Sequence, residues 1–166
     1  MKLDEIEEHL IRLGAGNHSD NMARLRQYQC YLCMAMNEDD FLSTVFLQNE
    51  EVLTIAPRGD SRSLRNVARR AIDSKLRVLS SNWDLNRNLE RMRRQLASGG
   101  ICLDSPVLCE TRTSETKYGA WYLQDGSHRS LAYAMLVLMG EVQYGQQIAF
   151  CAMGDRTAAA LIGLDH

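Results

Sequence analysis

Long apolar stretches are missing from this chain of 166 residues. The longest apolar run, residues 131–139, is far shorter than the roughly 20 residues that a membrane-spanning helix needs. The first ten residues, MKLDEIEEHL, are acidic and contain no apolar signal-peptide core. The sequence therefore predicts a protein without a membrane segment, and we expect it in the cytoplasm.

Proline and paired cysteines are also scarce. Neither Pro57 nor Pro106 interrupts a helical pattern. The five cysteines are odd in number and share no repeated spacing, which argues against a disulfide framework. Cys30 and Cys33 form a single C-x-x-C motif, whereas a zinc site needs two further ligands at a suitable spacing. We interpret both thiols as packing residues, one turn apart on a helix over residues 20–36.

No single sign of charge dominates, since the net charge is −2, but the charge is unevenly distributed. Residues 58–94 hold 11 basic and 4 acidic residues, a local charge of +7, whereas the rest of the chain carries −9. The middle of the chain can therefore meet an anion, but the whole is not a general nucleic-acid binder. Its arginines fall on two helix faces: Arg62, Arg65 and Arg69 on the first, and Arg87, Arg91 and Arg94 on the second.

Hydrophobic periodicity predicts one α/β domain over residues 1–166, with a small mixed sheet and packed helices. We expect a mostly helical extension over residues 1–75 and a core over residues 76–154. The predicted helices are residues 3–13, 20–36, 61–73, 86–98 and 127–139, with a short one in the tail. The predicted strands are residues 51–56, 75–81, 101–112, 120–125 and 146–153, whereas 41–48 is ambiguous.

The most informative stretch is WYLQDGSHRSLAYAMLVLMG, residues 121–140. Gly126 permits a sharp turn between a strand and a helix, and Ser127 is a candidate N-cap. The first amides of the helix then point outward and favour phosphate or carboxylate. His128 and Arg129 lie in the first turn, where Arg129 can donate two hydrogen bonds to an anion. The helix beyond is apolar all round and belongs in the core.

A purely structural interpretation stands beside this one. In it, Ser127 only caps the helix, Asp125 only closes the turn, and Arg129 pairs with a neighbouring acid. The residues alone leave both interpretations open.

The order of elements over residues 86–153 resembles the ParB/sulfiredoxin superfamily. The resemblance rests on NLERMRRQLASGG, ICLDSPVLCET, AWYLQDGSHRSLAYAM and QIAFCAMG, and above all on the Asp-Gly-Ser-His-Arg box. In free serine kinases of that superfamily the related box binds nucleotide phosphates. The resemblance thus implies a ParB/sulfiredoxin-like core that binds ATP, ADP or CTP with Mg²⁺, and a phosphate site formed by Gly126, Ser127, His128 and Arg129.

Several departures from the superfamily pattern reduce the range of activities that the resemblance implies. Ser127 stands where sulfiredoxins have their cysteine, which excludes sulfinic-acid reduction by a thiol at that position. Ser105 precedes Pro106, where ParB-like proteins commonly have glutamine. Only 12 residues follow Gly154, too few for the helix-turn-helix domain of partition proteins.

The sequence thus favours a nucleotide-dependent phosphotransferase or nucleotide hydrolase with an unknown small-molecule substrate. Asp125 and His128 are its candidate catalytic residues, Asp125 is also a candidate metal ligand, and Asp104 or Glu110 is a candidate second acid. The main alternative is a ParB-like DNA-binding or nuclease module that uses the arginine faces. A third alternative is a serine hydrolase with Ser127 as nucleophile, but the Asp-Gly-Ser-His-Arg box lacks the second glycine of a nucleophile elbow. A fourth is a protein that only binds partners and keeps this site as a relic.

Overall fold

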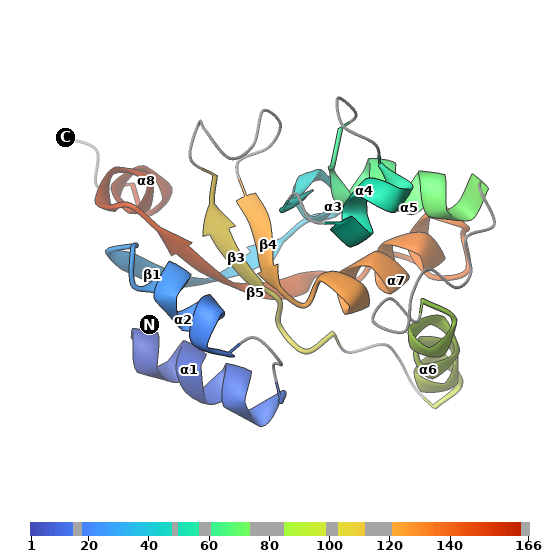
Figure 1. Cartoon of the computed structure of the whole chain (residues 1–166), viewed down its shortest axis with the longest axis horizontal. Coiled ribbons are helices and arrows are strands. Elements are labelled where there is room, and N and C mark those ends of the chain that lie inside the picture. Colours follow the sequence, from blue (N-terminus) through green and yellow to red (C-terminus); the bar gives the residue numbers. More distant parts are fainter. Residues whose placement is uncertain are drawn as a thin grey trace.

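A computed structural model describes residues 1–14, 18–47, 50–56, 61–73, 85–98, 103–111 and 121–163 of the chain. Its centre is a five-stranded mixed sheet with the strand order β1-β5-β3-β4-β2 (Figure 1). The strands are β1 (Cys30–Met36), β2 (Val45–Phe46), β3 (Val107–Glu110), β4 (Trp121–Asp125) and β5 (Gln147–Met153). The mixed α/β class expected from the sequence is thereby confirmed.

The described sheet contains two antiparallel and two parallel pairs of neighbouring strands. β1 pairs antiparallel with β5, and β3 pairs antiparallel with β4. β5 runs parallel to β3, and β2 runs parallel to β4. The strands that end at Asp125 and Met153 thus share the sheet, as predicted.

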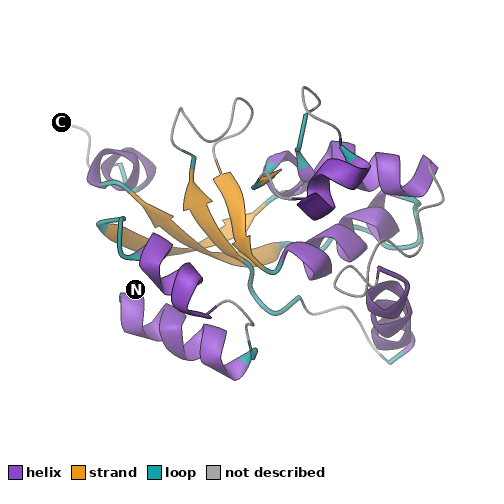
Figure 2. Cartoon of the chain, viewed as in Figure 1, coloured by secondary structure: helices purple, strands orange, loops and turns teal. Residues whose placement is uncertain are grey.

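Helices cover both faces of the sheet (Figure 2). One face packs against α1 (Leu3–Arg12) and α2 (His18–Leu25). The helices whose apolar residues join the core on the other face are α3 (Glu38–Ser43), α4 (Glu50–Ile55), α5 (Leu64–Asp73), α6 (Leu85–Ala97) and α7 (Ser127–Leu138). The short α8 (Asp155–Leu161) packs next to β1. Neighbouring strand residues alternate between the two cores, as the pleat requires: Leu123 lies in the larger core and Tyr122 in the smaller.

Helix α7 is the central element of the larger core. Its residues from Ser130 to Leu136 are all buried, and α5 and α6 pack against it. Gly140, with φ 70°, follows its end. The prediction of a buried helix from an all-round apolar sequence is confirmed.

The predicted cap and apolar face of α5 are also confirmed. The Ser63 hydroxyl accepts a hydrogen bond from the Asn66 amide at 3.3 Å, and Leu64, Val67 and Ala71 are buried. Leu89 and Met92 of α6 point into the same core.

Two predicted elements are wrong. The helix expected over residues 20–36 ends at Leu25, where the Tyr31 hydroxyl donates to the Leu25 carbonyl at 2.8 Å. The remainder is strand β1, because an apolar run reads alike as helix or strand and pairing with β5 decides between them. The strand expected over residues 51–56 is helix α4, in which Val52 and Ile55 are buried at helical spacing, and Ala56 directly after the helix is also buried.

The remaining predictions concern shorter segments. The ambiguous residues 41–48 contain the end of α3 followed by β2. The strand expected over residues 75–81 lies outside the described residues. Both β1 and β2 come from the first 75 residues, so this part of the chain supplies the two edge strands. Within the described ranges, no helix has the length and apolar character to cross a membrane.

Candidate functional site

The turn between β4 and α7 is built around a glycine that the backbone requires. Gly126 has φ 83° and ψ 14°, a left-handed conformation that L side chains rarely adopt. A Cβ at this position would lie 3.3 Å from the Cα and Cβ atoms of Pro106. The loop before β3 therefore lies directly against the turn, and glycine satisfies both the backbone angle and the close approach.

The N-cap of α7 is Gly126 and not Ser127, which corrects the sequence prediction. Ser127 is the first residue of the helix, and the first helical bond runs from the Ser130 amide to the Gly126 carbonyl at 2.9 Å. Because a glycine has no side chain, the N-cap cannot accept from the first amides of α7. This start of the helix therefore suits an external acceptor such as a phosphate oxygen.

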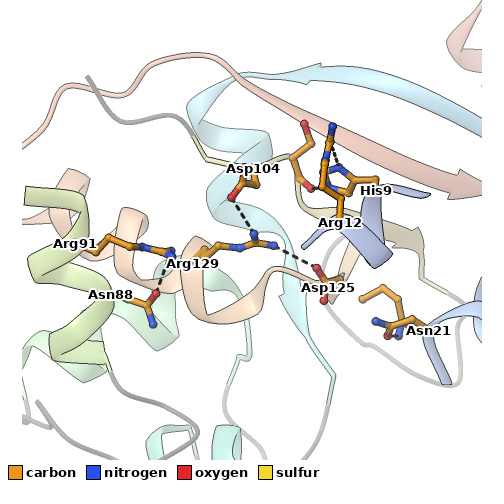
Figure 3. Close-up of polar contacts among 10 residues, drawn as sticks. His9, Arg12, Asn21, Asn88, Arg91, Asp104, Asp125 and Arg129 are labelled. Atoms are coloured by element: carbon orange, nitrogen blue, oxygen red, sulfur yellow. Dashed lines mark hydrogen bonds and ion pairs between the residues drawn. The ribbon is translucent and has the colours of Figure 1, made fainter. Parts of the chain in front are cut away.

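Arg129 lies between two carboxylates (Figure 3). Its Nη1 atom lies 3.2 Å from Oδ2 of Asp104, and its Nη2 atom lies 3.3 Å from Oδ2 of Asp125. The Arg129 and Asp125 side chains are only 17% and 19% exposed, whereas Asp104 is 56% exposed. The pairing with neighbouring acids, one of the two interpretations left open by the sequence, is thus the arrangement in this structure.

The predicted site residues from Asp125 to Arg129 are contiguous, and each is half-buried at this junction. Of the two candidate second acids, the fold brings only Asp104 to them. Glu110 lies at the opposite end of β3, where it accepts from the Gly154 amide at 2.8 Å and from the Thr157 hydroxyl. Glu110 therefore holds the start of α8 and takes no part in this site.

The donor set can be tested against Mg²⁺. The described residues contain no group of three or more histidine, cysteine, aspartate or glutamate side chains that could hold a metal ion. Mg²⁺ is nevertheless commonly bound through one or two carboxylates together with substrate phosphates. Asp104 and Asp125, which meet at Arg129, fit that smaller requirement.

Two contacts from the N-terminal helices support the site, and sequence reasoning missed both. Nε2 of the buried His9 lies 2.9 Å from the Ser105 carbonyl oxygen, next to the proline that covers Gly126. The side-chain Nε2 of Gln124, one residue before Asp125, donates to Oδ1 of the buried Asn21 at 2.6 Å. The available signal for His9 was its place among Ile6, Leu10 and Leu13 on the apolar face of the first helix.

The two arginine faces are partly engaged by acids. Arg65 of α5 pairs with Asp39 at 2.7 Å. Arg93 of α6, outside the predicted face, donates two hydrogen bonds to Glu141 at 2.7 and 2.6 Å. The exposed arginines of the predicted faces are Arg69, Arg87, Arg91 and Arg94.

The C-x-x-C motif lies on strand β1 and not on a helix. Because successive strand residues alternate in direction, Cys30 and Cys33 point to opposite faces of the sheet. Because they lie on opposite faces, the two thiols cannot ligate one metal ion together. A hydrogen bond to the Asp155 carboxylate also raises the pKa of the Cys30 thiol.

Comparisons of the chain with protein-family models, with curated proteins and with solved structures found no match.

Proposed function

We propose that this protein is a small nucleotide-phosphate-binding enzyme of the ParB/sulfiredoxin-like superfamily. Its reaction would be phosphoryl transfer from ATP or ADP to a small molecule, or nucleotide hydrolysis, in the cytoplasm. The observation that carries the proposal is the junction of β4 and α7, where the start of a buried helix lies beside Arg129 and two carboxylates. Phosphoryl transfer depends mainly on positioning and charge neutralisation, and these groups suit both.

Each residue has a role in this proposal. The backbone amides around Gly126 and Ser127 donate to phosphate oxygens. The Arg129 guanidinium exchanges a carboxylate partner for the phosphate, to which it can donate two hydrogen bonds. His128 donates to a phosphate oxygen or moves a proton. Asp125 accepts a proton from the attacking group or shares a Mg²⁺ ion with Asp104.

The two acids also predict how the site responds to Mg²⁺. A phosphate reaching Arg129 must displace at least one carboxylate and meets the negative charge of both. Asp104 and Asp125 are the residues that would hold a Mg²⁺ ion, whose charge would offset theirs. Nucleotide should therefore bind more tightly with Mg²⁺ than without it.

Nucleotide binding and its dependence on Mg²⁺ are tested by a thermal-shift panel of ATP, ADP and CTP, with and without Mg²⁺. A nucleotide present at about 100 times its Kd should add about 2.7 kcal/mol of apparent stability. Arg129→Ala should weaken binding about tenfold to a hundredfold, because it removes charged hydrogen bonds worth about 1.5–3 kcal/mol. Arg129→Lys should also bind less tightly than wild type, since lysine offers a point charge in place of a fork.

Arg69→Ala is the matched control, because Arg69 is exposed on α5 and belongs to no described ion pair of the site. That variant should bind nucleotide like the wild type. The proposal is wrong if no nucleotide shifts the wild type, or if Arg129→Ala binds as tightly as wild type while both melt cooperatively.

A nucleic-acid-binding or nuclease module is the second candidate. The observation that favours it is the set of exposed arginines on α5 and α6, two helices that both pack against α7. A polyanion would then contact several arginines together, and its binding would fall steeply with added salt.

A further inference from the structure

Strand β1 forms one edge of the sheet over seven residues. All seven pair with β5 on one side, from Cys30 opposite Met153 to Met36 opposite Gln147. In the described part of the chain, no strand pairs with its other side. An edge of this kind presents backbone donors and acceptors that a further strand can satisfy.

The sequence of β1 does nothing to discourage such pairing. CYLCMAM contains no charge, no proline and no glycine, and its pairing with β5 is regular along the whole strand. Proteins usually protect a sheet edge with a charged residue, a proline, a bulge or a very short strand. This edge has none of these devices.

An apolar strip leads from β5 to that edge on one face of the sheet. Cys33 and Ala35 of β1 are exposed, and Ile148, directly opposite Ala35, is 43% exposed. These three side chains share a face because they lie in register or two residues apart along a strand. A partner that extends the sheet would therefore also find apolar surface beside the new strand.

We propose that the occupant of this edge is β1 of a second copy of this chain, paired antiparallel about a two-fold axis. One register pairs all seven residues of both strands, and it sets Cys33 opposite Cys33 of the second copy. The axis is perpendicular to the sheet, so equivalent faces lie on the same side and the two apolar strips join. The sheets of the two copies become one.

Charge complementarity favours this occupant. The residues before β1 include the exposed Arg24 and Arg26, whereas Glu38, Asp39 and Asp40 follow it and are also exposed. Antiparallel pairing places the basic end of one copy next to the acidic end of the other, at both ends of the interface. The other charged groups near these ends leave this contrast in place: Asp155 and Arg156 at the first end, and Arg65 paired with Asp39 at the second.

The experiment measures self-association of the full chain by sedimentation equilibrium under reducing conditions. Wild type should form a dimer, and Cys33→Lys should weaken it about tenfold or more, a loss of about 1.4 kcal/mol. The reason is that two like charges would face each other at the centre of the pairing. The matched control is Met139→Lys, at the far end of α7, where another exposed apolar side chain becomes charged without effect on the dimer.

A cross-link tests the register independently of whether Cys33→Lys folds. Residues directly opposite in an antiparallel pair have Cα atoms about 4.5–5.5 Å apart, which a disulfide can join. Mild oxidation should therefore convert wild type to a covalent dimer and leave Cys33→Ser monomeric on a non-reducing gel. A monomeric wild type, a dimer that Met139→Lys disrupts equally, or a dimer without the Cys33 cross-link would overturn the proposal.

Discussion

Gly126 occupies a position where two separate constraints meet. Its φ of 83° lies in the left-handed region, and its missing Cβ leaves room for Pro106. Gly14 has a comparable φ of 64°, but a Cβ there would meet nothing within 4 Å. Comparing substitutions at Gly126 and Gly14 therefore separates the free-energy cost of the backbone angle from that of steric crowding by Pro106.

We therefore expect Gly14→Ala to lose about 1–2 kcal/mol of stability from the backbone angle alone. Gly126→Ala should lose about 1 kcal/mol more, because Pro106 must also move. Urea unfolding of both variants measures the difference. Equal losses would show that the loop before β3 yields without cost.

At the same scale, Arg129 shows how a residue's chemistry depends on its neighbours. Its guanidinium could serve a phosphate or a carboxylate equally well, and the sequence left that choice open. The structure places Asp104, 25 residues earlier in the chain, within hydrogen-bonding distance. The fold thus determines that Asp104 is the acid outside the Asp-Gly-Ser-His-Arg box that pairs with Arg129.

At the scale of elements, the ion pair of Arg93 and Glu141 joins α6 to the segment that follows α7. The hydrogen bonds from Arg93 lower the pKa of the Glu141 carboxyl. A carboxyl whose pKa is lower in the folded protein contributes stability above its unfolded pKa and loses it as the pH falls through the folded pKa. This ion pair should therefore weaken only in acid.

Glu141→Gln should consequently be less stable than wild type at neutral pH, by less than about 1 kcal/mol because the Arg93 and Glu141 side chains are 47% and 35% exposed. The difference should shrink as the pH falls below the usual range of a glutamate carboxyl. Urea unfolding at a series of pH values measures it, with Glu8→Gln on α1 as the control. A difference that stays constant into acid would contradict the assignment.

The elements also show where sequence patterns were sufficient. Helix α7 was predictable because its all-round apolar sequence continues for more than two turns, too long for a buried strand. Strand β1 was not, because seven apolar residues fit either secondary structure and its partner β5 begins more than a hundred residues later. Helix α4 carried a helical spacing of buried residues that the prediction overlooked.

At the scale of the whole molecule, the distribution of charge separates the two candidate functions. Residues 58–94 carry +7 and the rest of the chain carries −9. A polyanion approaching the arginine faces therefore meets repulsion from much of the molecule, whereas a nucleotide needs one local site. Arg65 and Arg93 are moreover paired with acids.

We expect no binding of duplex or single-stranded DNA tighter than the non-specific range of about 10⁻⁴–10⁻⁶ M at physiological salt. A salt titration of labelled DNA, run beside the nucleotide titration, measures this. Tight binding with a log–log slope of about 0.7–0.9 per neutralised phosphate would favour the nucleic-acid module. That conclusion would be firm if the binding survived Arg129→Ala and disappeared when the arginines of α5 and α6 were neutralised.

The sequence by itself determined the local features of this protein. The turn at Gly126, the buried helix after it and the contiguous box from Asp125 to Arg129 depend on residues within a few positions of one another. Periodicity and backbone preference act over that range, so these features could be read from the chain.

Only the tertiary structure decided which distant groups meet. It paired Asp104 with Arg129, moved Glu110 to the cap of α8, and turned the segment of Cys30 and Cys33 into an edge strand. The physical reason is that strand pairing and close packing depend on the register between segments far apart in the chain. A local pattern of apolar and polar residues contains no record of that register.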